Sequence, residues 1–557
     1  MEKPVYVMWL CYSHDASVAL IKDGIPIVSI QKERLSRIKH DWSIVDINLD
    51  ECINYCLNEA QIKLEDIDLF VENSPSLMYC KDKDNILWYT VERLLDNVGK
   101  EKIMQISHHL AHAYWVFWAS PFSESTVMII DWQWNYKEDL TEDISEAKIF
   151  PENSESSFIE RESFYQFSEN WFKVLRKNLW KVHKSFISIC WLWHMYEKVS
   201  SYAFKSRFDA WKLMGLAPYW KSIEENDFLS FSDSWEILYQ NDWTKKYKNP
   251  NFDGKQLEEN WEEYSNIAHK TQNELEKWIL YLAKWIKSNS DSENLCYSWW
   301  VSLNCSSNNL IKQDSWFKRI FIAPAASDAW ISVWCAFYGY LNVLKKEKAK
   351  FEYSDYLWKK YSDAEILKAL KKYPRLKAAH ESEICKVTAN LIAEWNIIWW
   401  FQWSSELWPR ALWNRSIIWD PRNAEMKDIL NLKVKKRESF RPFAPSVLEE
   451  YSLEYFDIGN SPFMLYTANV KEDKKTLIPA IVHVDWTSRI QTVSKTQNKK
   501  YHELIDEFYK VTWIPMVVNT SFNKDEPIVE TPEDAIRCFL WTNIDYLVLW
   551  NHLVSKA

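Results

Sequence analysis

Residues 4–30 read PVYVMWLCYSHDASVALIKDGIPIVSI, and this stretch decides the fold of the part of the chain that follows it. The apolar run 4–12 predicts a buried strand, and a polar Ser-His-Asp turn follows at residues 13–15. Two further apolar segments flank Asp23-Gly24, a dipeptide typical of tight hairpins. The opening therefore predicts three consecutive strands, joined by a polar turn and a tight turn.

Helical and strand patterns alternate after this opening. Helical patterns near 48–61 and 83–98 are interleaved with strand patterns near 67–71 and 102–106. The alternation indicates an α/β architecture, and with the three-strand opening it is typical of one half of an actin-like or sugar-kinase-like ATPase. Further strands are predicted over 126–131, 295–298 and 319–323, and a long amphipathic helix over 257–290.

The lysine-rich run KKEKAK at 345–350 is the predicted domain boundary. A solvated helix inside a single domain would carry the same pattern of charge, and this alternative stays open. The predicted domains are 1–350 and 351–557. The second is again α/β, with strands predicted near 396–401, 479–484, 490–493 and 515–519.

The composition is that of a soluble globular protein, with 47% hydrophobic and 26% charged residues over 557 positions. The net charge of −10 argues against a nucleic-acid backbone as the main partner. We find no apolar run of the roughly 18–20 residues that span a bilayer, and no signal-peptide pattern at the start. Because the ten cysteines are sparse and irregularly spaced, we expect reduced thiols and a cytoplasmic protein.

The counts of glycine and tryptophan are abnormal, at 6 and 35 residues. Glycine usually makes up about 7% of a chain. Several tryptophans fall where a tight turn needs glycine, as at 299–300 and at Trp408 and Trp413 around Pro409. We therefore predict that most of these tryptophans are glycines in the natural protein, encoded by UGA codons that mean glycine but are translated here as tryptophan. The alternative is a truly tryptophan-rich protein.

Histidines and acids in the first domain predict a metal site. His108 and His112 are four residues apart, so on a helix they share one face and can bind one ion. Asp131, at a strand end, and Asp328, in a polar loop, can add oxygen ligands. Two imidazoles and two carboxylates suit iron, zinc or manganese, and the ligand set alone does not choose among them. A purely structural histidine pair is the alternative.

Three segments are candidate loops for binding a nucleotide or a phosphate. Residues 297–305 (YSWWVSLNC), read with glycine at 299 and 300, become a strand and a loop whose backbone N–H groups can face phosphate. Residues 211–220 are a candidate for the same pocket, and residues 519–523 (NTSFN) follow an apolar strand. In these segments we assign binding roles to Lys212, Ser298, Asn304, Asn519 and Ser521.

Basic residues gather in the second domain. Arginine binds phosphate through two parallel hydrogen bonds and lysine through a point charge, so a cluster of both favours a phosphate-containing ligand. An ordinary set of surface charges is the alternative interpretation. The cluster consists of Arg410, Arg415, Lys435, Arg437, Arg441 and Arg489.

The chain resembles the O-carbamoyltransferase family that modifies nodulation factors, cephalosporins and aminoglycosides. The main departures are tryptophans where the family pattern has glycine, which supports the reassignment of tryptophan. Ala210, where an acid is expected, is a further departure. The matching segments run in order over nearly the whole chain: 11–15, 33–41 (ERLSRIKHD), 108–113, 212–219, 299–305, 408–416, 434–445 (VKKRESFRPFAP), 483–491 and 519–523.

The resemblance implies an N-terminal actin/sugar-kinase domain, like that of the tRNA threonylcarbamoyltransferases. It also implies a C-terminal α/β domain like the threonylcarbamoyl-adenylate synthases. The metal is then iron(II), held by His108, His112, Asp131 and Asp328. Carbamoyl phosphate and the nucleotide are held by Arg410, Lys435 and Arg441, with Arg489 as a further binding residue.

The implied reaction moves a carbamoyl group from carbamoyl phosphate, through carbamoyl adenylate made with ATP, to a hydroxyl of a small molecule such as a sugar or secondary metabolite. His14 is the candidate general base, and a turn histidine bonded to the backbone is the alternative.

We expect no nucleic-acid or membrane partner and leave a homodimer open. The rival functions are tRNA threonylcarbamoyl transfer, which the acidic balance and basic second domain disfavour, and an actin-like scaffold, which leaves that basic cluster unexplained.

Overall fold

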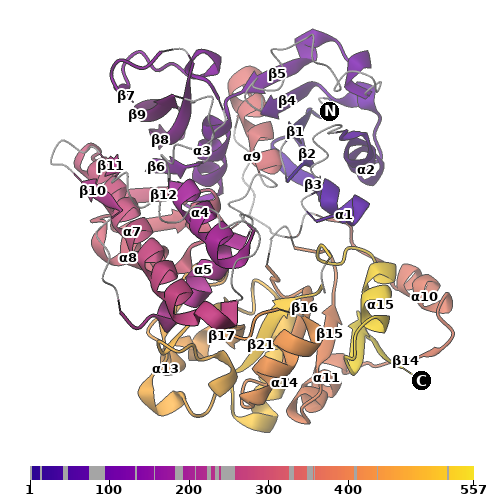
Figure 1. The fold of residues 1–557 in the computed structure, drawn as a ribbon. Coiled ribbons are helices and arrows are strands. Elements are labelled where there is room, and N and C mark those ends of the chain that lie inside the picture. The colour runs from indigo at the N-terminus through magenta and orange to yellow at the C-terminus, as the bar shows by residue number, and fades with distance from the viewer. Residues whose placement is uncertain are drawn as a thin grey trace. The chain divides into compact units, whose positions relative to one another are not determined.

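The chain forms two compact units (Figure 1). The first comprises Met1–Lys32 and His40–Glu352, and the second comprises Glu33–Lys39 and Tyr353–Ala557. The division at 352/353 lies beside the boundary expected at residue 350. The computed structural model describes residues 3–12, 15–39, 41, 48–73, 94–131, 135–155, 157–181, 192–206, 209–222, 228–231, 237–239, 257–324, 331–347, 356, 358–406, 410–435, 437–523 and 526–556.

The opening strands form the first sheet of unit 1, as predicted. Strands β1 (Tyr6–Cys11), β2 (Ser17–Lys22) and β3 (Ile25–Gln31) pair antiparallel. On the other side of β1, the strands β4 (Leu69–Asn73) and β5 (Ile103–Ile106) pair parallel. The order is therefore β3-β2-β1-β4-β5. Helix α2 (Asp50–Ala60) occupies the segment predicted to be helical over 48–61.

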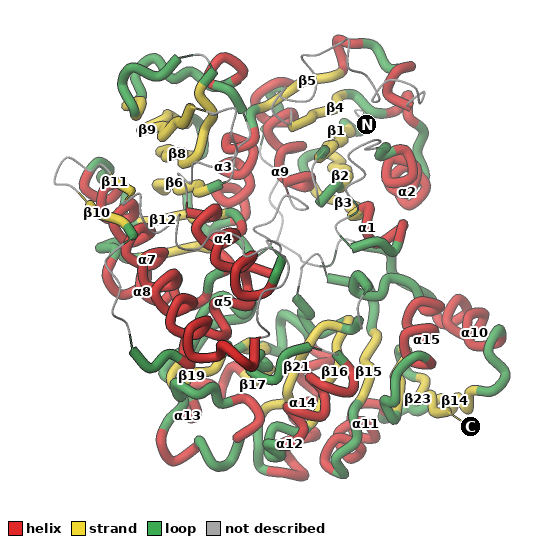
Figure 2. Tube along the Cα trace, viewed as in Figure 1, coloured by secondary structure: helices red, strands yellow, loops and turns green. Residues whose placement is uncertain are grey.

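The second sheet of unit 1 repeats this pattern around β6 (Glu124–Ile130). The long strands β8 (Phe158–Ser168) and β9 (Phe172–Lys181) continue it antiparallel, whereas β12 (Asn294–Ser298) and β13 (Arg319–Ile322) continue it parallel. A short strand, β7 (Lys148–Phe150), pairs parallel with β9 at the edge. Apart from the additional edge strand β7, the two sheets have the same order of antiparallel and parallel strands. This is the duplicated arrangement of an actin/sugar-kinase-like domain and confirms the predicted fold class. Strands are drawn in yellow in Figure 2.

Unit 2 is a mixed α/β domain built on one sheet of eight strands, in the order β14-β23-β22-β15-β16-β21-β17-β20. Helices α11 (Ile384–Ala393), α14 (Lys499–Thr512) and α15 (Pro532–Leu540) belong to this unit. The strands are β14 (Leu376–His380), β15 (Ile398–Phe401), β16 (Arg415–Trp419), β17 (Ala444–Leu448), β20 (Gln491–Val493), β21 (Met516–Ser521), β22 (Tyr546–Leu549) and β23 (His552–Lys556).

One predicted strand of unit 2 is wrong. The segment 479–484 contains a 3-10 helix, Pro479–Ile481, rather than a strand. Pro479 has no N–H to donate to a neighbouring strand, and its fixed φ suits the first turn of a helix. The apolar run therefore forms a helical turn instead of pairing with a strand.

A short N-terminal segment belongs to unit 2. Helix α1 (Lys32–Ser36) begins the stretch Glu33–Lys39. The guanidinium groups of Arg34 and Arg37 both donate to the carbonyl of Ile528, at 3.0 and 2.9 Å. Arg37 also donates to the Pro527 carbonyl at 2.8 Å and to Glu526 at 2.9 Å. Residues 33–39 of the second matching segment are thus part of unit 2.

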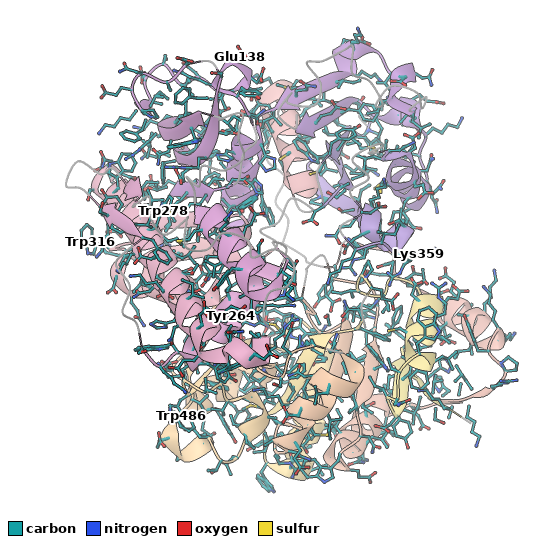
Figure 3. The ribbon with its side chains drawn as sticks, in the orientation of Figure 1. Glu138, Tyr264, Trp278, Trp316, Lys359 and Trp486 are labelled. Carbon is teal, nitrogen blue, oxygen red and sulfur yellow. The ribbon has the colours of Figure 1, made fainter. Side chains whose placement is uncertain are left out.

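Tryptophan is unusually frequent among residues with left-handed backbone. In the described part of the chain fourteen non-glycine residues have a positive φ, and eight of them are tryptophans. Left-handed backbone costs a residue with a Cβ about 1–2 kcal/mol, whereas glycine adopts it without this cost. Trp316 and Trp486, labelled in Figure 3, are 60% and 57% exposed, so burial of the indole does not repay this cost. The eight are Trp299, Trp316, Trp395, Trp403, Trp413, Trp486, Trp513 and Trp550.

Within the ranges that the structure describes, we find no helix with the length and apolar character needed to cross a membrane.

Candidate functional site

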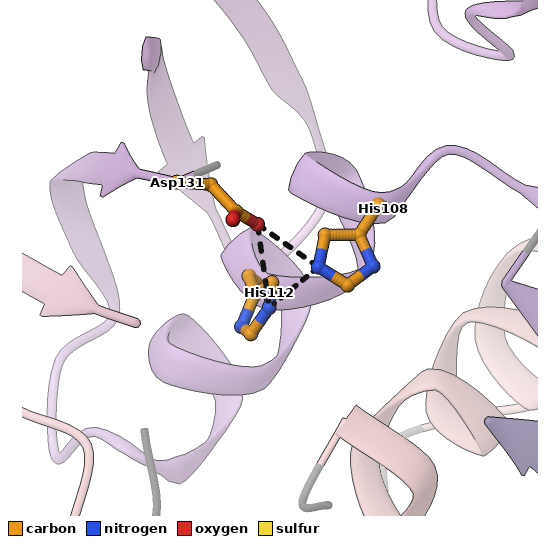
Figure 4. A group of neighbouring side chains, drawn as sticks. All are labelled: His108, His112 and Asp131. Atoms are coloured by element: carbon orange, nitrogen blue, oxygen red, sulfur yellow. Dashed lines mark hydrogen bonds and ion pairs between the residues drawn. The ribbon is translucent and has the colours of Figure 1, made fainter. Parts of the chain in front are cut away.

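Three predicted metal ligands meet in unit 1 at the end of β6 (Figure 4). His108 and His112 lie on successive turns of helix α3 (His108–Ala119), and Asp131 directly follows β6. The Nε2 atoms of the two histidines are 3.1 Å apart. Asp131 Oδ2 is 2.9 Å from His108 Nε2 and 4.0 Å from His112 Nε2. All three side chains are buried, and their donor atoms lie within 4.8 Å of one another.

This geometry fits one divalent ion. Two ligands bound at about 2.1 Å with tetrahedral or octahedral angles lie roughly 3.0–3.4 Å apart, close to the observed spacing of the imidazole nitrogens. A buried carboxylate oxygen beside two imidazoles is a donor set suited to iron, zinc or manganese. The predicted fourth ligand, Asp328, lies outside the described residues.

The described start of the predicted loop 297–305 lies beside the metal triad. Strands β6, β12 and β13 are parallel, so their carboxyl ends meet at one edge of the sheet. Ser298 ends β12 and is fully buried. The ring of Trp299 is 6.3 Å from that of His112, and its φ of 99° is a conformation that glycine adopts without strain. The structure therefore brings Ser298 and the metal triad together.

Two other predicted binding residues of unit 1 have local structural partners. Asn304 is the N-cap of helix α8 (Cys305–Asp314), where its Oδ1 accepts from the Ser307 N–H at 3.0 Å. Its amide also donates to Gln272 Oε1 at 2.9 Å. Lys212, in helix α5 (Ala210–Leu216), pairs with Asp209 at 3.1 Å. The candidate base His14 lies outside the described residues.

The basic residues of unit 2 gather at one edge of its sheet. Strand β21 is antiparallel to β16 and β17, and β20 is parallel to β17. The starts of β16, β17 and β20 therefore share an edge with the end of β21. We call this edge the basic edge; the residues that its strands or adjoining loops carry are Arg410, Lys435, Arg437, Arg441, Arg489, Asn519 and Ser521.

Lys435 fastens the loop after β21. Its ammonium donates to the carbonyls of Ser521 and Asn523 at 2.6 and 2.7 Å, and to Asn523 Oδ1 at 2.8 Å. Burial, followed by the positive charge of Arg437, lowers the pKa of Lys435 well below its usual value. The three oxygen acceptors favour the charged form and oppose that lowering. Since three protein oxygens occupy this ammonium, Lys435 shapes the loop and adds charge to the edge.

Arg437 is part of the same cluster, although the sequence alone suggests no separate role for it. Burial and then the charges of Arg441 and Arg489 lower its pKa well below the usual value. Its Nε donates to Asn431 Oδ1 at 2.7 Å. Glu438, 3.6 Å from Arg441, offsets part of this positive charge. A phosphate group is a suitable counter-charge for the rest, because burial makes unbalanced cations costly. The sequence analysis places Arg437 in the basic cluster, two residues after Lys435.

The loop that carries Arg410 is tied to the same edge. The Ala411 carbonyl accepts from the side-chain amides of Gln491 at 3.2 Å and Asn519 at 3.3 Å. Arg410 itself donates to the Met464 carbonyl at 2.6 Å. By contrast, Arg415 is fully buried over the Phe401 ring and bonds backbone carbonyls, including that of Trp403 at 3.1 Å. We therefore assign Arg415 to the fold rather than to ligand binding.

The chain thus carries a possible metal-ligand triad in unit 1 and a basic edge in unit 2. Comparison with family models makes this specific. The model of the carbamoyltransferase N-terminus matches residues 7–81 and 78–336, and that of the carbamoyltransferase C-terminus matches residues 389–556. The chain belongs to the carbamoyltransferase family and is a transferase.

Two curated relatives match nearly the whole of this chain. Nodulation protein NolNO of Sinorhizobium fredii strain NGR234 is 31% identical over 98% of this chain and 79% of its own. An uncharacterised Synechocystis protein is 31% identical over 98% of this chain and 96% of its own. Among solved structures, HypF in a phosphate- and nucleotide-bound form aligns with 63% of this chain and 57% of its own at 10% identity, with a TM-score of 0.33. That score is too low to inform function.

Proposed function

We propose that the protein is an ATP-dependent O-carbamoyltransferase that uses carbamoyl phosphate and forms carbamoyl adenylate. The observation that carries this proposal is the basic edge of unit 2, where Lys435 and Arg437 are buried among further cations. Carbamoyl phosphate and the triphosphate of ATP are both small, dense anions that match this charge. The family assignment supplies the carbamoyl group as the species transferred.

The first half-reaction takes place at the basic edge. Water cleaves carbamoyl phosphate to carbamate and phosphate, and a carbamate oxygen then attacks the α-phosphorus of ATP. An O–P bond forms, pyrophosphate leaves with the electron pair of the broken bond, and carbamoyl adenylate remains. Arg437, Arg441 and Arg489 offset the negative charge on the phosphates during both displacements.

The second half-reaction takes place in unit 1. The hydroxyl of the acceptor attacks the carbamoyl carbon, the bond to the AMP oxygen breaks, and AMP leaves. His14 is the proposed base that takes the hydroxyl proton.

A divalent ion held by His108, His112 and Asp131 would supply positive charge to the nucleotide phosphate, and iron(II) is the ion that the resemblance implies. Asp328 is the proposed fourth ligand, from the sequence alone. Ser298, which ends β12, is the proposed contact to the nucleotide.

Release of pyrophosphate from ATP tests the proposal. The wild-type protein should release pyrophosphate only when carbamoyl phosphate is present, and Arg441→Ala should lower that rate by roughly 10- to 100-fold, the worth of one charge-assisted contact. Arg422→Ala is the matched control, because Arg422 pairs locally with Asp420 at 2.6 Å. Pyrophosphate release that ignores carbamoyl phosphate, or equal losses in both variants, would contradict the assignment.

A further inference from the structure

A buried lysine in unit 1 joins two carboxylates beneath the metal triad. Lys177 Nζ is 2.5 Å from Glu142 Oε1 and 2.8 Å from Glu160 Oε2, and the three side chains are fully buried. The ammonium also donates to the Tyr165 hydroxyl at 2.8 Å. Apolar residues of similar volume would usually serve a core as well as a buried ion group does. The fold alone therefore gives little reason for three charges at this place.

The Glu142 arm holds the start of helix α3. The hydroxyl of Ser107 donates to Glu142 Oε2, and the Ser107 N–H donates to Thr141 Oγ1 at 2.9 Å. Ser107 is the N-cap of α3 and immediately precedes His108. The first turn of the helix that carries both metal-binding histidines is thereby fixed to the buried lysine.

The Glu160 arm holds His109, which lies between the two arms. Glu160 Oε1 accepts the His109 N–H at 3.4 Å, and its Oε2 lies 3.5 Å from His109 Nδ1. The same Nδ1 is 2.6 Å from Ser163 Oγ. With Nδ1 occupied on that side, the opposite nitrogen, Nε2, lies 3.6 Å from Asp131 Oδ2, within ion-pair range but longer than a hydrogen bond. That oxygen is the one that also contacts His108.

We propose that His109, held by the Lys177–Glu142–Glu160 group, is a positioning residue that aims the Asp131 carboxylate and the first turn of α3 at a shared divalent ion. This inference rests on the proposed metal site and adds the residues that organise it. Carboxylates that bind metals are usually held by hydrogen bonds from a second layer of residues, and loss of such a partner typically lowers metal affinity 10- to 100-fold. The two glutamates outweigh the effect of burial on Lys177 and raise its pKa, so the ammonium stays charged.

Binding of Co²⁺ to the full chain tests the proposal, because its visible absorption bands report the geometry of the ligands as well as occupancy. The variants are His109→Phe, which removes the ring nitrogens, His109→Gln, which keeps an N–H donor near the Nε2 position, and Lys177→Met. Arg176→Met is the matched control. Arg176 is the buried neighbour of Lys177 in β9, and its side chain bonds Asn178 over the Trp285 ring instead.

We expect His109→Phe and Lys177→Met to bind Co²⁺ about 10- to 100-fold more weakly and with shifted absorption bands. His109→Gln should recover part of the affinity. Arg176→Met should bind Co²⁺ as the wild type does. Near-ultraviolet circular dichroism identifies variants that are not folded; if Lys177→Met is one of them, the His109 pair decides. Wild-type Co²⁺ affinity and bands in His109→Phe would overturn the positioning role and leave the metal site standing. A wild-type protein that binds no more Co²⁺ than His108→Ala/His112→Ala would overturn the metal site and this inference together.

Discussion

Trp513 ends helix α14 with a φ of 61°, and its N–H donates to the Tyr509 carbonyl at 2.7 Å. This left-handed closure is the position at which glycine most often follows a helix. The indole is 75% exposed, so it gains little from packing. The backbone conformation at this residue therefore favours glycine. The composition of the whole chain, with 6 glycines and 35 tryptophans, points to the same replacement.

We therefore expect Trp513→Gly to raise the free energy of unfolding by about 1 kcal/mol, because the left-handed strain of a residue with a Cβ is removed. Trp541→Gly is the control: it is also an exposed tryptophan after a helix, α15, but its φ is −84°. There glycine should lower stability by about 0.5–1 kcal/mol through backbone entropy. Urea denaturation measures both, and equal effects at the two sites would contradict the backbone argument.

Protein from the natural source tests the recoding itself. We expect its tryptic peptides to carry glycine at position 513 and at the other seven positive-φ tryptophans. Tandem mass spectrometry reads these positions directly, and peptides that carry tryptophan at position 299 and at position 413 would refute the reassignment.

The roles of single residues were the hardest to predict from sequence. Asn304 looks like a ligand of a phosphate loop, yet it caps a helix. Lys177 lies between Arg176 and Asn178 and reads as part of a solvated strand, although it is fully buried. Its two carboxylates are 17 and 35 positions earlier in the sequence, and only the pairing of β8 with β9 brings Glu160 near it. Long-range pairing of this kind leaves no local pattern.

At the scale of elements, the strand ends were predictable because strand and helix patterns alternate. Asp131 after β6 and Ser298 at the end of β12 share an edge for this reason. The antiparallel β8–β9 hairpin and the 3-10 turn at Pro479 were not predicted, since an apolar run does not by itself reveal its partner. The convergence of loops on the basic edge likewise depends on the sheet order, which the chain order does not give.

The basic edge should make phosphate a stabilising ligand in a pH-dependent way. Folding lowers the pKa of Lys435, so between its folded and unfolded pKa values the unfolded chain binds more protons. The contribution of Lys435 to the free energy of unfolding therefore rises with pH across that window. Inorganic phosphate favours the charged lysine, so it should raise Tm most below the window and less as the pH passes through it.

Thermal melts with and without phosphate, at several pH values, measure this effect. Arg441→Gln should lose most of the phosphate-induced shift, whereas Lys510→Gln should keep it, because Lys510 pairs with Asp506 and Glu507 on an exposed helix face. If the phosphate-induced rise in Tm does not depend on pH, Lys435 has no part in phosphate binding.

At the scale of the whole molecule, the two half-reactions should be separable by mutation. Arg410→Ala should lower carbamoyl-phosphate-dependent formation of the adenylate by roughly 10- to 100-fold, yet still transfer the carbamoyl group from supplied carbamoyl adenylate. His14→Ala should do the reverse. Single-turnover assays of each half-reaction measure the two rates. If folded Arg410→Ala loses both equally, one shared site is the better model.

Because Glu33–Lys39 belongs to unit 2, the chain cannot be cut between 352 and 353 without separating this segment from the rest of its unit. A cut at 352/353 would leave the downstream fragment without Arg34 and Arg37, and so with the Ile528 carbonyl and Glu526 stripped of the donors they have in the intact chain. The upstream fragment would carry the missing piece. The two halves are therefore suited to be a split protein: expressed together they should complement each other, and the 353–557 fragment expressed alone should need a graft of residues 33–39 to become stable.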